Sequence, residues 1–436
     1  MKGPPKSKFT VLCATFCLIG ALLSCGGGAI TPAPMSSTGG FRQTNLVSDS
    51  AGTAAHTDPF LLNPWGFAFQ PGQSFFIADN NRGSAKVFDP SGNPDIPSVV
   101  GIPAPSGSAL PSAPTGIVSN PVAQDFLVRG TPAQFLLATE DGTISTWATI
   151  NGNFPTNALL ARDDSARGAV SKSRAILTPQ CCREYLALAN FHNGFIATYD
   201  INFNLLATTG SFKDSNLPAG YPPFNIQQIG TEVFVTYAVQ DATGTSPLVV
   251  PGNGIVSVFD QEGNFTRFAS NGPLNAPWGI VQASANFGRF SNDILIDNFG
   301  DGTINAFDPT TGNFLGQLKD SSGKVITNPG LWALVFRSDG VGNPDTLYFT
   351  AGSSGEDHGL FGAILSPAVW VGHSCPTPLT LICYRVPHLP HPSRFWAAWV
   401  LTSMIPSCTN QNWGIIANSL NSPHSRFHAP RVSSLL

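Results

Sequence analysis

Six copies of one hairpin pattern recur along the chain, and this repetition limits the fold more than any other feature of the sequence. In each copy an apolar segment ends in polar residues, and a glycine-containing turn follows. A second, alternating segment then usually ends in an aromatic residue and Asp. Alternation at every second residue on both sides of a Gly, Asn or Asp turn is typical of a β-hairpin. The copies are residues 75–93, 135–153, 185–204, 233–264, 294–313 and 347–365.

A further short apolar strand precedes each hairpin, and other candidate strands lie between the copies, for example at 265–269 and 314–318. Four antiparallel strands repeated six times predict an all-β fold, a six-bladed β-propeller of four-stranded blades. The preceding strands are residues 65–69, 115–119, 174–178, 225–229, 278–282 and 332–336.

The ends of the repeat array predict how the ring closes. The sixth copy ends after its third strand, near Leu365, whereas a spare strand at residues 43–47 precedes the first copy. Pairing this N-terminal strand into the last blade would hide two exposed sheet edges. We therefore expect one propeller domain over residues 41–366, closed by its N-terminal strand.

The composition agrees with a turn-rich β protein, since Gly (44) and Pro (37) together approach a fifth of the 436 residues. Residues 26–366 hold 15 Lys and Arg against 26 Asp and Glu, a net charge of −11. Phosphate binding depends on basic groups, so this balance argues against a nucleic-acid partner. We expect a monomer whose partner is an extracellular ligand or protein.

Residues 1–25 have the pattern of an export signal, in which three lysines precede the apolar run Phe9–Leu23. The run is too short for a comfortable membrane span. It ends in Leu-Leu-Ser-Cys-Gly, which resembles the lipobox of bacterial lipoproteins, with Cys25 as the lipidated residue. The alternative is an ordinary signal peptide. Both interpretations predict export, to the bacterial cell envelope or to the medium, with a lipid anchor as the only membrane contact.

A Gly-, Pro- and Ser-rich tether, residues 26–40, separates the export signal from the propeller. Residues 367–436 differ from the rest of the chain, because they contain no Asp, Glu or Lys but five of the eight His. Two interpretations stay open for this segment. It is either the product of a shifted reading frame or a disordered tail.

Several segments resemble an uncharacterised family of secreted bacterial NHL-like β-propeller proteins, some of which carry a PEP-CTERM sorting tail. They include NLVSDSAGTAAHTDPFLLNPWGFAF, ATEDGTIS, LPAGYPPFNIQQIG, NAPWGI and DNFGDGTINAFDPTTGNFLGQL, in that order. The resemblance covers about residues 41–365 and implies a six-bladed propeller in an exported protein. It implies no reaction, and residues 367–436 lack the family's sorting pattern.

The stretch DNFGDGTINAFD, residues 297–308, places acidic residues and a glycine where a calcium-binding EF-hand loop has them. An EF-hand also needs flanking helices, a polar residue at position 3 and usually Glu at position 12. Here position 3 is Phe299, position 12 is Asp308, and both flanks have strand-like sequences. We therefore predict a blade hairpin instead of an EF-hand.

Strand direction predicts which residues share one mouth of the central channel. In each blade the start of the first strand and the end of the second strand meet at the same face. We expect this face to bind the ligand, with the tryptophans either packing together or forming the floor of a pocket. The predicted face carries Trp65, Asp79, Asn80, Asp141, Trp278, Trp332 and Asp357.

Three functions fit this face. The first is a non-catalytic binding or scaffold module, and the second is a calcium-dependent lactonase or phosphoesterase-like hydrolase. In the hydrolase, Glu140, Asp297 and Asn298 would bind the candidate cofactor Ca²⁺, and His358 would act as general base. The third is an extracellular structural or adhesion component. Asp and Asn in turns commonly serve only local hydrogen bonds, which favours the non-catalytic readings.

Overall fold

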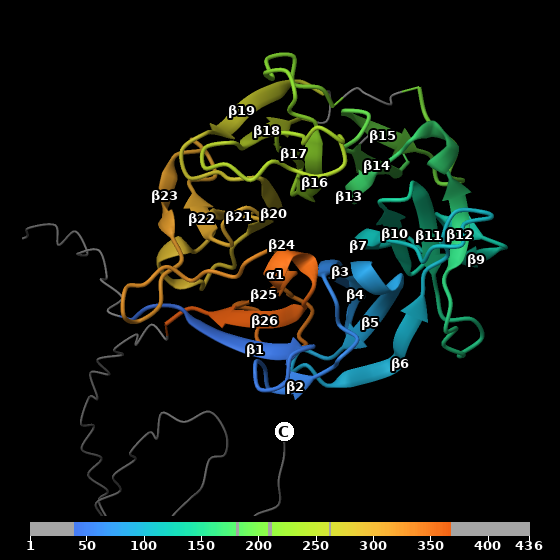
Figure 1. The fold of residues 1–436 in the computed structure, drawn as a ribbon, viewed down its shortest axis with the longest axis horizontal. Helices are drawn as coiled ribbons and strands as arrows, with labels where there is room; N and C mark the ends of the chain where they lie inside the picture. Colours follow the sequence, from blue (N-terminus) through green and yellow to red (C-terminus); the bar gives the residue numbers. More distant parts are fainter. Residues whose placement is uncertain (1–38, 180–182, 208–211, 261–262, 368–436) are drawn as a thin grey trace, which may run out of the picture. The chain divides into compact units, whose positions relative to one another are not determined.

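The computed structural model describes residues 39–179, 183–207, 212–260 and 263–367, all within one unit that spans Met1–Val371. These residues form six antiparallel sheets arranged as a six-bladed β-propeller, and Figure 1 looks along the axis of the ring. The first blade comprises β3 (Pro64–Phe69), β4 (Phe75–Asp79), β5 (Ser84–Phe88) and β6 (Pro94–Gly101). The second comprises β7 (Pro114–Ser119), β10 (Phe135–Thr139), β11 (Thr143–Trp147) and β12 (Leu159–Asp163), with β8 (Leu127–Val128) and β9 (Thr131–Pro132) forming a small extra hairpin.

The remaining blades repeat this order. The third sheet contains β13 (Ser171–Leu177), β14 (Tyr185–Asn190) and β15 (Phe195–Tyr199), and the fourth contains β16 (Pro223–Ile229), β17 (Glu232–Tyr237), β18 (Ile255–Phe259) and β19 (Phe265–Ser270). The fifth contains β20 (Pro277–Gln282), β21 (Ile294–Asn298), β22 (Ile304–Phe307) and β23 (Phe314–Gln317). The sixth contains β24 (Leu331–Val335), β25 (Thr346–Ala351) and β26 (Leu360–Leu365), together with β1 (Arg42–Ser48) and β2 (His56–Thr57).

The first strand of every blade lies innermost, and neighbouring innermost strands contact one another around the ring, in the order β3, β7, β13, β16, β20, β24 and back to β3. All six were predicted from the short apolar segments that precede the hairpins, and each begins slightly earlier than expected. Buried apolar side chains from adjacent blades pack between the sheets. The fold prediction is therefore confirmed.

The N-terminal strand closes the ring as predicted. Strand β1 pairs antiparallel with β26, with Arg42 opposite Leu365 and Ser48 opposite Leu360. In Figure 1 the blue β1 lies beside the red-orange β26, although the two come from opposite ends of the described chain. This pairing covers the outer edge of β26 and completes the sixth blade.

Residues 297–308 form the hairpin of β21 and β22, so the prediction against an EF-hand is also confirmed. Gly302 in its turn has φ 69°, a left-handed conformation that favours glycine. A Cβ atom there would lie 2.2 Å from the Asn328 carbonyl oxygen, so a larger residue would require the backbone to move.

One buried ion pair connects the last blade to the first. The Arg337 guanidinium binds both carboxylate oxygens of Asp339, at 2.6 and 3.0 Å, and donates to the Gln73 carbonyl at 2.7 Å. It also lies 4.3 Å from the centre of the Phe69 ring and 4.7 Å from that of Phe75. The Arg337 hydrogen bonds hold the pKa of Asp339 well below its ordinary value.

Several predictions concern segments that lie outside the described residues. These are the export signal with Cys25, most of the tether and nearly all of the tail at 367–436. In the described part of the chain, no helix has both the length and the apolar character needed to cross a membrane.

Candidate functional site

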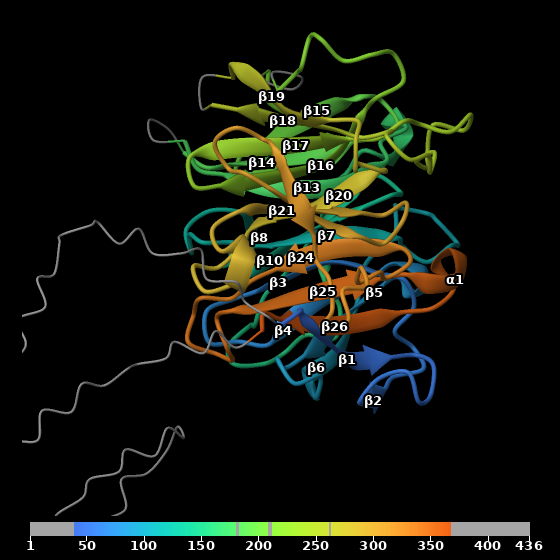
Figure 2. The same cartoon turned by 90° about the vertical axis from the view of Figure 1, so that its left-hand side faces the viewer.

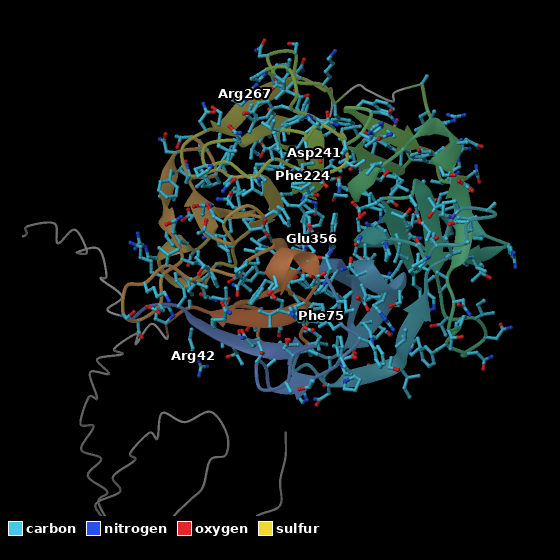
Figure 3. The ribbon with its side chains drawn as sticks, viewed as in Figure 1. Arg42, Phe75, Phe224, Asp241, Arg267 and Glu356 are labelled. Atoms are coloured by element: carbon cyan, nitrogen blue, oxygen red, sulfur yellow. The ribbon has the colours of Figure 1, made fainter. Side chains whose placement is uncertain are left out.

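Aromatic side chains fill the channel beneath one of its mouths. Trp65 and Trp332 stack with ring centres 3.6 Å apart, and Trp278 meets both edge-on at 6.4 and 5.8 Å. Phe224 and Phe299 pack around Trp332, and Figure 3 shows Phe224 near the centre of the ring of sheets. Each tryptophan is at most 4% exposed, so the indoles contact one another within the channel rather than facing solvent.

Five polar side chains bonded to one another gather at this mouth, and we call them the mouth cluster. Two of them, Asn63 and Lys172, contact the aromatic layer directly. Three of the five lie at strand ends, as the direction argument requires, because one precedes β3 and the others directly follow β4 and β10. The fourth lies in β13, and the fifth lies in α1 (Ser353–Glu356), the short turn after β25. The members are Asn63, Asn80, Glu140, Lys172 and Glu356.

Hydrogen bonds and one ion pair join the mouth cluster into a single network. The Lys172 ammonium pairs with one oxygen of Glu140, and Asn80 Nδ2 donates to the other at 3.1 Å. Asn63 Nδ2 donates to Glu356 Oε2 at 2.7 Å and lies 3.4 Å from Asn80 Oδ1. The network thus connects the first, second, third and sixth blades across the mouth.

Lys172 connects the network to the aromatic layer. Its side chain is only 3% exposed, and its ammonium lies 5.0 Å from the centre of the Trp65 ring. A buried ammonium needs a counter-charge, and Glu140 supplies it. The pair holds the Glu140 carboxylate in place while leaving 27% of that side chain exposed to solvent.

Glu356 lies on a strained turn over the mouth. Ser354, Gly355 and Glu356 all have positive φ values, of 55°, 73° and 73°, which is unusual for the two residues with side chains. Figure 2 shows α1 beyond the strand ends on one side of the ring, and Figure 3 places Glu356 near its centre. Burial, and secondarily the charge of Glu140, raises the pKa of Glu356.

The structure places the other predicted face residues in different surroundings. Asp79 is fully buried, accepts hydrogen bonds from Leu62 N at 2.9 Å and Ser84 Oγ at 3.2 Å, and has a pKa raised to about 7 by burial. Asp141 lies in the turn after β10 and accepts a long hydrogen bond from Thr143. Asp357 is exposed. Of the seven residues predicted to bind the ligand, Asn80 alone joins the mouth cluster, and Glu140, predicted on the same face as a metal ligand, joins it as well.

The three predicted metal ligands each have their own protein partners. Glu140 pairs with Lys172, and the buried Asp297 accepts a hydrogen bond from Gly279 N at 2.6 Å. Burial raises the pKa of Asp297 well above its ordinary value, which disfavours the charged form that a cation requires. Asn298 donates to the Pro273 carbonyl at 2.7 Å. Among the described residues, no group of three His, Cys, Asp or Glu is arranged to hold a metal ion.

His358 lies at the surface, next to the point where β1 pairs with β26 and closes the ring. Its Nδ1 is 2.6 Å from Asp49 Oδ2, just beyond β1, and the same carboxylate accepts a hydrogen bond from Gly359 N at 2.9 Å. The hydrogen bond to Asp49 raises the pKa of His358. Although burial opposes it, hydrogen bonding to His358 and Gly359 lowers the pKa of Asp49.

This pair predicts a pH-dependent contribution to stability. A histidine with a raised pKa in the folded state stabilises the protein below about pH 6.5, and this effect is lost as pH rises through the raised value. We expect His358→Asn to lower the melting temperature clearly at pH 5.5 and only slightly at pH 8.5. The control is His192→Asn, since the His192 ring contacts the Gly244 carbonyl at 3.2 Å. An equal effect of His358→Asn at both pH values would contradict the ion pair.

Sequence reasoning did not nominate Asn63 and Lys172. The signal for Lys172 was present, because the third blade has Ser-Lys-Ser at the place where two others have Pro-Trp-Gly. A lysine at a position that is tryptophan in other repeats indicates that this side chain does more than fill the core. For Asn63 no comparable signal exists, because its side chain joins the network through folded contacts alone.

Two proteins of Acanthamoeba polyphaga mimivirus, the uncharacterized proteins R648 and L690, are each 31% identical to this chain. The matches extend over 334 and 335 residues, which are 74% of this chain and 80% and 85% of the viral proteins. No protein-family model matches the chain. Relatives from a giant virus do not support the bacterial origin that the sequence resemblance implied.

Solved structures with a similar arrangement include two enzymes. One is the soluble aldose sugar dehydrogenase of Escherichia coli, at 11% identity and a TM-score of 0.43, covering 75% of this chain and 99% of the dehydrogenase. The other is virginiamycin B lyase of Staphylococcus aureus, at 13% identity and a TM-score of 0.41, covering 74% and 98%. Similarities this weak carry no argument about activity.

Proposed function

This chain belongs to the protein family of the mimivirus proteins R648 and L690. We propose that it is a non-catalytic binding propeller. Its ligand contacts the mouth cluster. The observation that carries the proposal is the aromatic layer of Trp65, Trp278 and Trp332, which fills the channel under that cluster. A substrate could not descend into the channel, so recognition takes place at the mouth.

The charges of the mouth cluster favour a ligand with a positively charged group. Two carboxylates, Glu140 and Glu356, face one ammonium, and that ammonium is buried against Glu140. Glu356 uses Oε2 to accept from Asn63, while Asp357 beside it is exposed. The acidic body of the propeller adds a field of the same sign. A lysine- or arginine-rich segment of a partner protein fits this surface.

The test measures binding of fluorescent lysine- and arginine-rich peptides by anisotropy, with glutamate-rich peptides of equal length for comparison. Glu356→Gln is expected to weaken binding of the basic peptides about 10- to 150-fold, because a charged hydrogen bond is worth about 1.5–3 kcal/mol. Glu232→Gln is the matched control, since this exposed glutamate is the first residue of β17 and is not a member of the mouth cluster. If Glu356→Gln bound the basic peptides as tightly as the wild type does, the mouth cluster would not be the binding site.

A calcium titration with a chelator control separates this proposal from the hydrolase hypothesis. The binding propeller should melt at the same temperature with Ca²⁺ and with chelator. A calcium-dependent rise that Glu140→Gln and Asp297→Asn both abolish would instead favour an ion site and a search for lactone or phosphoester substrates. Peptide binding without any charge preference would favour a structural or adhesive role.

Export belongs to the same proposal. The proposal of export is based on the sequence pattern of residues 1–25, in which Cys25 would be the lipidated residue. An extracellular location accords with a partner that is a surface or secreted protein. Labelling cells that express the chain with a lipid precursor, with Cys25→Ala for comparison, tests the anchor.

A further inference from the structure

Arg174 is a buried cation with no protein counter-charge. It lies in β13, two residues beyond Lys172, and is 3% exposed. All three of its guanidinium nitrogens are buried, and none of them has a hydrogen-bond partner among the described residues. Guanidinium groups keep their proton in proteins, so Arg174 cannot escape the cost of burying an unpaired charge by becoming neutral. Arg337, the other arginine that is buried in the described part of the chain, has Asp339 beside it.

The guanidinium borders a cavity of about 50 Å³ at the centre of the ring. Residues from the innermost strands of all six blades line the cavity, which places it on the channel axis. Small residues at equivalent positions of these strands create the space, among them Gly66, Gly116 and Gly279. A Cβ atom on Gly116 would lie 2.8 Å from Arg174 Nη1, so the side chain packs directly over that glycine.

The lining offers hydrogen-bond donors and no negative charge. Among the described residues that line the cavity, none is Asp or Glu. Trp278 lines it too, and its indole nitrogen is buried without a partner in the described structure. Asn225 is already engaged, since its oxygen accepts from Ser173 Oγ and Ile226 N and its nitrogen donates to the Trp278 carbonyl.

We propose that this central cavity binds one small monovalent inorganic anion, such as chloride, through the guanidinium of Arg174. An unpaired buried charge is strongly unfavourable, and one counter-ion of opposite sign removes most of that cost. The volume exceeds the roughly 30 Å³ that a water molecule occupies in the liquid. It suits a halide better than a larger organic anion. The site is independent of the mouth cluster and of the ligand proposed there.

The first test follows the melting temperature of the full chain as sodium chloride replaces sodium gluconate at constant ionic strength. We expect a rise of about 2 °C when chloride reaches about ten times its dissociation constant, because only the folded state holds the ion. Arg174→Met should abolish the chloride response. Arg167→Ala is the matched control, since Arg167 is 61% exposed, and its response should equal that of the wild type.

The second test does not depend on a variant that folds. Wild-type crystals soaked in sodium bromide should show an anomalous scattering peak in the cavity beside Arg174. A cavity that contains only water would give no such peak and no difference between chloride and gluconate, and either result would overturn the proposal. A chloride response that persists in Arg174→Met would overturn it as well, because the ion would then bind elsewhere.

Discussion

Replacing Arg337 with methionine is expected to lower the free energy of unfolding by about 3–5 kcal/mol, measured by urea denaturation at pH 7. Methionine keeps apolar packing on Phe69 and Phe75 but leaves Asp339, a nearly buried carboxylate, without its cation. Removing one partner of a buried pair costs far more than the pair itself is worth, because the remaining charge stays out of water.

Two comparisons make this prediction specific. The double variant Arg337→Met/Asp339→Asn should recover part of the loss, since it leaves no unpaired charge. Arg167→Ala should change stability by at most about 1 kcal/mol, because Arg167 is exposed and its partner Asp164 keeps the second cation, Arg162. The lowered pKa of Asp339 also adds stability above about pH 3.8, and this part is lost as pH falls further. The wild type and the single variant should therefore converge in acid.

Trp332→Ala is the second substitution with a large expected effect. Its indole stacks on Trp65, contacts Phe299 with ring centres 4.3 Å apart, and donates a hydrogen bond to Asn63 Oδ1 at 2.9 Å. Removing a buried tryptophan typically costs about 3–5 kcal/mol. We expect a loss at the upper end of this range, because the substitution opens a cavity and also deprives Asn63 of its donor.

Trp332→Phe separates these two contributions. Phenylalanine keeps an aromatic ring in the layer but has no N–H for Asn63, so a smaller loss of about 1–3 kcal/mol is expected. The same urea measurements report both variants. If alanine and phenylalanine at position 332 were equally destabilising, the hydrogen bond to Asn63 and not the stacking would dominate. If neither changed stability, the channel would not be filled as described.

The fold was predictable because its information is local and repeated. A period of two in hydrophobicity, interrupted by glycine turns, defines each hairpin. Six repeats of that unit leave few alternatives to a ring. The calcium-like stretch at 297–308 was correctly interpreted as a hairpin because Phe299 and the flanking strands excluded a metal loop. The ring closure was also predictable, because the sixth repeat had only three predicted strands and the strand at residues 43–47 belonged to no repeat.

The site was harder to predict, because strand direction gives the end of the ring at which a residue lies but not how deeply its side chain is buried. Asp79 is the last residue of β4 and Asn80 directly follows it, yet only Asn80 reaches the mouth cluster. The contribution of Glu356 depends on three consecutive left-handed residues, which no periodicity encodes. Asp297 shows the same limit, since a carboxylate at a strand end proved to be completely buried.

The strand pairing that completes the sixth blade also sets an order of events during synthesis. Strand β1 is among the first described elements to leave the ribosome, but its partner β26 is made after every other blade. At about 5–20 residues per second, β1 waits roughly 15–60 s with an unpaired edge. The nascent chain can fold its early blades one by one, whereas the last blade forms only when both ends of the propeller meet. Chaperone protection during this interval would therefore be most useful at β1.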